Sequence, residues 1–249
     1  MSSIYIHIPF CAHACPYCDF SFELLNGELV RRYMETLAIE IERRREEYPW
    51  RDTKFETLFF GGGTPTVLTP ERLKELFGII RTSFSIDSDA EITMEANPGE
   101  ASADHLRAYH NLGVNRISMG VQSLEPELLQ FLTRIHGPEE VFNTFEIARS
   151  AGFDNINCDL IFNIPGQTID IWKRDLLTIM DFRPEHMSCY SLTVEKGTQL
   201  YQYVNRGTVT MPSDDQSADL YLWTQSIMAK NGYEQYEISN WSKPENECR

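Results

Sequence analysis

The sequence has no run of eighteen apolar residues, so it predicts no integral membrane span. Its first ten residues, MSSIYIHIPF, lack the charged segment and long apolar stretch of a signal peptide. Basic residues are few, because 22 Lys and Arg stand against 37 Asp and Glu, giving a formal net charge of −15. Nucleic-acid binding needs clustered positive charge, so nucleic acid is excluded as a partner and an anionic membrane is disfavoured.

Cysteine is also scarce, yet three of the six cysteines, Cys11, Cys15 and Cys18, fall within eight positions. Such close spacing in a chain without a signal peptide is not typical of a disulfide framework. The sequence therefore predicts a reducing compartment, the cytoplasm. Cys158 and Cys189 lie in strand-like segments and are interpreted as small buried apolar residues.

Short apolar runs alternate with amphipathic segments along the chain. Strands are predicted at residues 3–9, 57–63, 91–98, 116–123, 155–165 and 186–194, with an edge strand at 233–241. Helices are predicted at 27–48, 70–84, 102–113, 169–182 and 217–232, and a helical region broken near 137–138 ends at about 151. Residues 205–216 are interpreted as a connector or a loop. Six β-α units in regular order predict an α/β fold whose parallel sheet winds doubly or closes into a barrel.

Cysteine, glycine and polar residues are found at or near the carboxyl ends of the predicted strands. They are Cys11 after the first strand, the glycines of FFGGGTPT in the second, Glu95 and Asn97 in the third, Gln122 in the fourth, Asp159 within the fifth, and Ser191 and Thr193 in the sixth. The carboxyl ends of successive parallel strands meet at one edge, where α/β folds place their sites. We therefore expect these groups to converge on one mouth.

The C-x3-C-x2-C spacing admits three interpretations. Thiolates select zinc, copper(I) or iron–sulfur clusters. A structural zinc site takes four ligands, so His7 or His13 would have to complete a Cys3His set. A cluster usually takes four cysteines, so three would leave one iron open to a substrate or cofactor, and the spacing favours this interpretation. A redox pair formed by Cys15 and Cys18 would leave Cys11 without a role.

The glycine run in FFGGGTPT lets the backbone approach a ligand closely. No Gly-Lys-Ser/Thr follows it, and it is not a G-x-G-x-x-G sequence, so it predicts no nucleotide phosphate site. Recognition of an amino acid by backbone groups fits the run, and so does a tight turn.

With Tyr17 just before the third cysteine, the triad resembles that of the radical S-adenosylmethionine (SAM) superfamily. The strings YIHIPFC, CPYCDF, FFGGGTPT, EANP, RISMGVQS, DLIFNIPGQT and YEISNW together resemble its oxygen-independent coproporphyrinogen III oxidase-like branch, and within it the heme chaperone subgroup. The likeness runs from about residue 4 to the end. It implies a partial (β/α)6 TIM-like barrel, with a radical SAM core over residues 1–240 and the start of a C-terminal region at 241–249.

The resemblance also implies roles for residues already singled out. Cys11, Cys15 and Cys18 would hold a [4Fe-4S] cluster, whose open iron would chelate the amino and carboxylate groups of S-adenosyl-L-methionine. Gly62, Gly63 and Thr64 would line the methionine amino group. The other cofactor contacts would be Tyr5, Tyr17, Glu95, Gln122, Arg134 and Asp159. Among these, Asp159 suits a ribose hydroxyl, and Arg134 suits the carboxylate as a charge-assisted pair.

Two departures from the branch bear on function. Coproporphyrinogen dehydrogenases carry a fourth cysteine two residues after the third, where this sequence has Phe20, as the chaperone subgroup does. The His-Asn-x-x-Tyr-Trp string and the C-terminal domain that follow in that subgroup do not appear before the last residue, Arg249, so we expect a partial sequence.

Three functions remain open at this stage. The resemblance implies a heme chaperone whose partners are heme or porphyrin, an electron donor and heme-accepting proteins. The alternative is an enzyme that decarboxylates two propionates of coproporphyrinogen III to vinyls. The third is a zinc- or thiol-stabilised α/β protein without radical chemistry.

Overall fold

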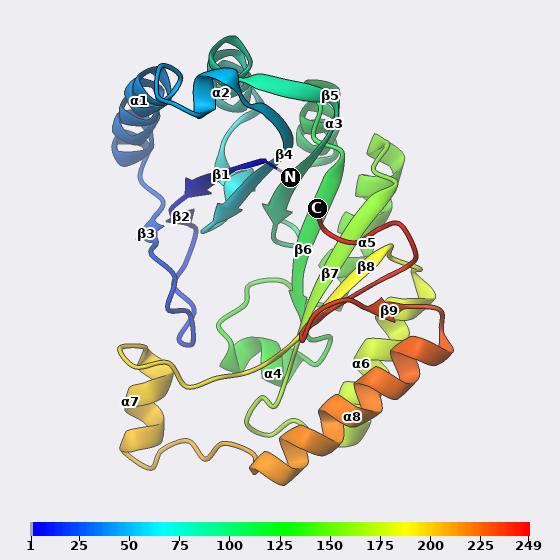
Figure 1. The fold of residues 1–249 in the computed structure, drawn as a ribbon. Helices are drawn as coiled ribbons and strands as arrows, with labels where there is room; N and C mark the ends of the chain where they lie inside the picture. Colours follow the sequence, from blue (N-terminus) through cyan, green and yellow to red (C-terminus); the bar gives the residue numbers. More distant parts are fainter. Residues whose placement is uncertain (1) are drawn as a thin grey trace.

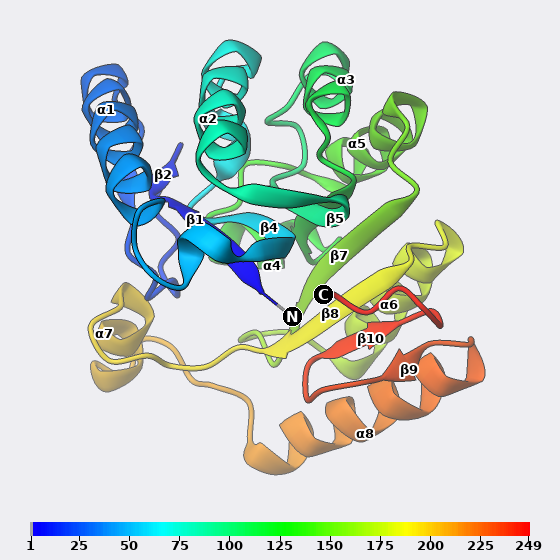
Figure 2. The same cartoon turned by 45° about the horizontal axis from the view of Figure 1, so that its top comes forward.

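The computed structural model describes residues 2–249, in which an eight-stranded sheet has the order β1-β4-β5-β6-β7-β8-β10-β9 (Figure 1). The first six of these strands are parallel neighbours, and β10 pairs antiparallel with β8 and β9. In this order the strands are Ser3–Ile8, Lys54–Gly62, Ser85–Ala96, Arg116–Gln122, Asn155–Phe162, His186–Ser191, Asn240–Ser242 and Glu234–Gln235. The sheet curves into a half-barrel that stays open between β1 and β9 (Figure 2).

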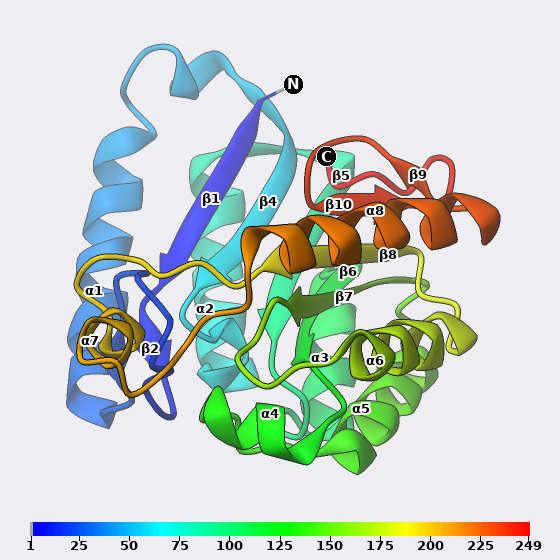
Figure 3. The same cartoon turned by 90° about the horizontal axis from the view of Figure 1, so that it is seen from below.

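Helices cover the outer, convex face of the sheet (Figure 2). They are α1 Gly27–Arg44, α2 Pro70–Ser83, α3 Ala103–Leu112, α5 Pro138–Ala151, α6 Ile169–Asp181 and α8 Asp214–Lys230. The short helices α4 Pro126–Phe131 and α7 Gln199–Asn205 lie at the carboxyl ends of the strands (Figure 3). A small second sheet pairs β2, Phe10–Cys11, with β3, Glu23–Leu24, and single 3-10 turns form at Trp50–Asp52 and Pro65–Val67. Local sequence sets many helix ends: Asn26 and Ser102 accept backbone N–H bonds as N-caps, and Gly113 closes α3 at a φ of 107°.

Each strand of the half-barrel is apolar on its convex face and largely polar on its concave face. In β6, Ile117, Met119 and Val121 are fully buried and pack into the main apolar core under the helices. The alternate residues Arg116 and Ser118 face the interior instead, as the two-residue period of a strand requires. The core therefore lies between sheet and helices, and the interior is left as a polar hollow.

The predicted α/β partial barrel with parallel strands is confirmed, with differences in detail. Helix α7 was not predicted, because seven residues are too short to show a helical period. The predicted connector at 205–216 shortens to a loop between α7 and α8. The edge strand predicted over 233–241 is two short strands, because a turn closed by Tyr236 N–H donating to Asn240 O at 3.3 Å interrupts it. No helix in residues 2–249 is long and apolar enough to cross a bilayer.

The last residues run back beneath the half-barrel. Lys243 N–H donates to Glu185 O at 2.8 Å, and Arg249 N–H donates to Glu91 Oε1 at 3.1 Å. This path brings the C-terminus to the amino ends of the central strands, the end of the molecule where the chain also begins (Figure 3). The division of the chain at residue 240 stays a prediction.

Substitutions at two neighbouring leucines of α6 would test which face of the helix packs into the core. Leu176 is fully buried against the sheet, whereas Leu177 is 41% exposed. We expect Leu176→Ala to lower the free energy of unfolding by about 2–5 kcal/mol and Leu177→Ala by less than about 1 kcal/mol, measured by urea denaturation. Equal effects of the two substitutions would contradict this orientation of α6.

Candidate functional site

The interior of the half-barrel holds a cavity of about 490 Å³. Eleven of the twelve residues predicted from sequence line it: Cys11, Cys15, Tyr17, Cys18, Gly62, Gly63, Thr64, Glu95, Gln122, Arg134 and Asp159. The twelfth, Tyr5, is 56% exposed and stacks at a centroid distance of 5.8 Å on Phe59, which does line the cavity. The structure thus brings together residues from the first cysteine loop and from strands β4 to β7.

Hydrogen bonds hold the cysteine loop from three sides. Leu25 N–H donates to Cys11 O at 2.8 Å, and the Thr133 hydroxyl, after α4, donates to Ala14 O at 3.1 Å. From α7, Leu200 N–H donates to Pro16 O at 2.8 Å. Helix α7, which the sequence did not reveal, therefore supports the segment that presents the thiols.

The thiols lie beside hydrogen-bond donors. Thr64 Oγ1 is 4.0 Å from Cys11 Sγ, and Arg134 Nη1 is 3.8 Å from Cys15 Sγ. Burial raises the pKa of Cys11 to about 11 and also raises the pKa of Cys18. Because a metal binds the thiolate, binding here must displace protons. Within residues 2–249, no three His, Cys, Asp or Glu side chains form a group that could hold a single metal ion.

Two glycines of the FFGGGTPT run are required by close packing. A Cβ on Gly63 would lie 2.6 Å from Phe10 O, at the start of the cysteine loop. Gly62 has a φ of 114°, and a Cβ there would lie 2.5 Å from His7 Nδ1. The end of β4 therefore approaches the cysteine loop as only glycine allows, and the Gly62 N–H is free to donate to Glu95 Oε2 at 3.0 Å.

Two carboxyl groups face the cavity. Burial, reinforced by the charge of Asp159, raises the pKa of Glu95 to about 7. Asp159 accepts hydrogen bonds from Ser118 Oγ at 3.1 Å and from Asn157 Nδ2 at 2.8 Å. Burial raises the pKa of Asp159, and these donors oppose the rise. The cavity thus contains one buried carboxyl, Asp159, that accepts hydrogen bonds from the protein, and a second, Glu95, whose pKa is raised to about 7.

Arg134 lines the cavity beside Cys15. Its Nη2 donates to Gly120 O at 3.0 Å and to Asn97 Oδ1, while its Nε is buried without a hydrogen-bond partner in the described residues. Gln122 follows a register shift in the pairing of β6 with β7 and has a φ of 67°. Backbone strain of this kind is concentrated at functional sites.

The donor set fits an iron–sulfur cluster. Three half-buried thiols on one short loop face one cavity, and a guanidinium and a hydroxyl lie beside two of the sulfurs. His13 also lines the cavity, and both of its ring nitrogens are buried without a hydrogen-bond partner in residues 2–249. The site therefore offers soft ligands together with polar groups not yet used by the fold.

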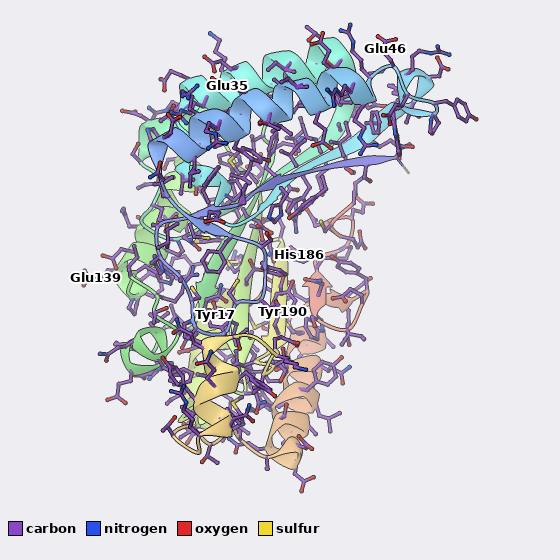
Figure 4. All side chains as sticks on the ribbon, turned by 90° about the vertical axis from the view of Figure 1, so that its left-hand side faces the viewer. Tyr17, Glu35, Glu46, Glu139, His186 and Tyr190 are labelled. Atoms are coloured by element: carbon purple, nitrogen blue, oxygen red, sulfur yellow. The ribbon has the colours of Figure 1, made fainter. Side chains whose placement is uncertain are left out.

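Sequence reasoning missed the lower part of this cavity, which lies toward the amino ends of the strands. The missed residues there are Arg116, Ser118, Asn157, His186, Ser188, Tyr236 and Asn240, and Tyr190 was missed near the carboxyl end of β8. Tyr17, Tyr190 and His186 line the hollow of the half-barrel, whereas Glu35, Glu46 and Glu139 point outward from the helices (Figure 4). The alternation of polar and apolar residues in RISMGVQ, NINCDLIF and HMSCYS is the signal that could have found most of them.

The structure is therefore an α/β half-barrel of parallel strands with a cysteine triad at its mouth. The chain belongs to the radical SAM superfamily, because the sequence model of that superfamily matches residues 5–178. The resemblance inferred from the motifs is thereby confirmed at the level of the superfamily.

The chain is also similar to two curated proteins and to one solved structure from one branch of this superfamily. The chain is 41% identical over 244 residues to the protein named heme chaperone HemW of Bacillus subtilis (strain 168), covering 98% of this chain and 64% of that protein. It is 38% identical over 248 residues to the protein of the same name from Escherichia coli (strain K12), covering 99% and 64%. The chain thus spans less than two thirds of the length of these curated relatives.

The solved structure of coproporphyrinogen III oxidase (HemN) from Escherichia coli, described as a radical SAM enzyme, aligns with a TM-score of 0.88 at 28% identity. The alignment covers 98% of this chain and 56% of that one. These similarities confirm the branch that the sequence strings indicated.

The raised pKa of Glu95 predicts that the free energy of unfolding depends on pH. The pKa of Glu95 is about 4.5 in the unfolded chain and about 7 in the folded protein. Between pH 4.5 and pH 7 the folded state therefore binds more protons than the unfolded state, and the free energy of unfolding falls as the pH rises. The loss assigned to Glu95 is on the order of 3 kcal/mol, complete above about pH 7. We expect Glu95→Gln to flatten this decline, measured by denaturation from pH 5 to 8 without added ligand.

The exposed Glu127 supplies the matched control, and Glu127→Gln should keep the wild-type pH dependence. An unchanged decline in Glu95→Gln would show that Glu95 titrates like a solvated carboxyl.

Proposed function

We propose that this chain is the cofactor-binding core of a heme chaperone, which binds heme and delivers it to heme-accepting proteins. The observation that carries the proposal is the cysteine loop itself. It presents three thiols to the cavity, and Phe20, which also lines the cavity and is 68% exposed, occupies the position of the dehydrogenases' fourth cysteine. The similarity to two proteins named heme chaperone supports the same function.

In this proposal Cys11, Cys15 and Cys18 hold a four-iron cluster and leave one iron without a protein ligand. A bound cluster supplies one-electron chemistry, and S-adenosyl-L-methionine supplies a sulfonium that accepts the electron. The similarity of the chain to the radical SAM superfamily supports both cofactors. The thiols must first lose their protons, so we expect cluster assembly to be favoured by mildly alkaline conditions.

The chain's own residues would orient the cofactor by charge and hydrogen bonding. Arg134 suits a carboxylate, because its guanidinium lines the cavity and its Nε has no hydrogen-bond partner in the described residues. Asp159 suits ribose hydroxyls, since its two oxygens are fixed by Ser118 and Asn157. Glu95 and the Gly62–Thr64 backbone would receive the methionine amino group, and Tyr17 and Gln122 would complete the contacts.

Tyr5 is the weakest member of the predicted set on geometry. Its ring lies outside the cavity, and its hydroxyl is 3.5 Å from His7 Nδ1. A role for Tyr5 would be to stack on Phe59 and fix the wall of the cavity.

The structural similarity to coproporphyrinogen III oxidase supports a second function, decarboxylation of coproporphyrinogen III propionates to vinyls. The two functions differ in the fate of the tetrapyrrole, which a chaperone releases unchanged. In either case an electron donor would reduce the cluster, and the chain would work in a reducing cytoplasm.

The full-length protein, reconstituted without oxygen, separates the two functions. With a low-potential reductant, S-adenosyl-L-methionine and coproporphyrinogen III, we expect no protoporphyrinogen above background, and transfer of bound heme to an apo-hemoprotein. Formation of protoporphyrinogen at the rate of a positive-control oxidase would contradict the chaperone proposal.

The cluster ligands are tested by iron content. We expect Cys15→Ala to lose most of the roughly four irons and four sulfides per chain that the reconstituted protein should contain. The buried Cys189 in β8 does not line the cavity, so Cys189→Ala is the matched control and should keep its iron. Full iron retention in Cys15→Ala would contradict the ligand assignment.

A further inference from the structure

Arg116, the first residue of β6, is a buried cation that the fold leaves without a partner. Its side chain is 2% exposed and lines the lower part of the cavity. Its Nε is buried without a hydrogen-bond partner, and no carboxylate in residues 2–249 forms an ion pair with it. Burying an unpaired charge is costly, so a fold that keeps one in a cavity is equipped to receive an anion there.

The charge of Arg116 opposes the rise in the pKa of Asp159, yet Asp159 and Glu91 accept their hydrogen bonds from other groups. Asp159 receives its hydrogen bonds from Ser118 and Asn157. Glu91 Oε1 accepts from Arg249 N–H at 3.1 Å and lies 3.7 Å from Cys248 Sγ, so it holds the C-terminal segment. Neither carboxylate neutralises Arg116 by direct contact.

The other polar neighbours form a neutral network. Asn157 Nδ2 donates to Ser118 and Asp159, so its Oδ1 accepts from His186 Nδ1 at 2.6 Å. The remaining ring nitrogen, Nε2, then accepts from the Tyr236 hydroxyl at 2.7 Å. Burial, with the charge of Arg116, lowers the pKa of His186 to about 3, so the ring is neutral. These hydrogen bonds fix the wall of the cavity around Arg116, the lower chamber, and Asn157, His186 and Tyr236 bring no negative charge to it.

The lower chamber lies at the end of the cavity away from Gln122, and Asp159 lies between the two ends. Arg116 and Gln122 stand at opposite ends of β6, roughly 20 Å apart along the strand. Tyr236, whose ring is 39% exposed and whose hydroxyl bonds to His186, lines the cavity on the Arg116 side, whereas Tyr190 lies near the carboxyl end of β8. An extended ligand with a flat apolar body and an acidic arm would therefore match this side of the cavity.

We propose that Arg116 is the binding residue of a carboxylate subsite that receives a propionate of the tetrapyrrole, with the macrocycle lying against Tyr236. The assignment of the propionate rests on the proposed function, because heme and coproporphyrinogen both carry such arms. The planar guanidinium matches a carboxylate through two parallel hydrogen bonds, which a lysine cannot reproduce. The carboxylate of S-adenosyl-L-methionine is the competing source of the same group.

The test measures the affinities of the full-length, cluster-reconstituted protein for heme, heme dimethyl ester and S-adenosyl-L-methionine. We expect Arg116→Gln to weaken heme binding tenfold or more, and Arg116→Lys to weaken it less. The ester should bind the wild type as weakly as heme binds Arg116→Gln, and the substitution should not weaken ester binding further. Affinity for S-adenosyl-L-methionine should stay within twofold, which also shows that the variants are folded.

Arg149 supplies a matched control, since it is a part-buried arginine outside the cavity that pairs with Glu185 at 2.7 Å. Arg149→Gln should leave all three affinities unchanged. Equal binding of heme and its ester to the wild type would overturn the subsite. A loss of affinity for S-adenosyl-L-methionine instead of heme would overturn it too, by assigning Arg116 to the cofactor.

If the wild type binds no heme at all, the proposed function fails and the subsite is tested alone with sodium propionate. The probe is then the 15N resonance of Arg116 Nε–H, identified by its disappearance in Arg116→Lys. A saturable shift with propionate supports the carboxylate subsite, and no shift overturns it.

Discussion

The alternation of apolar and polar residues along six parallel strands is the constraint on which this structure depends. Apolar side chains on the convex face, such as Ile117 and Met119, are buried beneath helices and stabilise the sheet. Side chains on the concave face are polar and leave the interior hollow. A one-residue slip in any strand would exchange the two faces, so the same pattern that builds the core also positions the site.

Polar groups inside a half-barrel need partners, and the pairing of strands supplies most of them. Asn157 stands between Ser118 and His186 in the sheet, so one amide links three strands and orients the Asp159 carboxylate. Among the described residues that line the cavity, His13, Arg116 and Arg134 keep buried ring or guanidinium nitrogens without hydrogen-bond partners. Their distribution separates an upper region beneath the cysteine loop from a lower chamber around Arg116.

Much of the fold follows from the sequence, because six β-α units show clear periods. Short elements do not, and α7, which supports the cysteine loop through Leu200 and Pro16, was missed for that reason. The cysteines were found by spacing and most other site residues by resemblance. Arg116, Asn157 and His186 were missed because they lie toward the amino ends of strands. Contacts such as His186 with Tyr236, fifty residues apart, depend on a register that one sequence does not display.

The thiols of Cys11, Cys15 and Cys18 and the cavity below them are proposed to hold a cluster and S-adenosyl-L-methionine in contact. Electron paramagnetic resonance of the reduced, reconstituted protein tests it most directly. The account predicts a signal from a cubane cluster whose g-values shift when S-adenosyl-L-methionine is added, because the cofactor binds the iron that lacks a cysteine. An intact cluster whose signal does not change with saturating S-adenosyl-L-methionine would contradict the account.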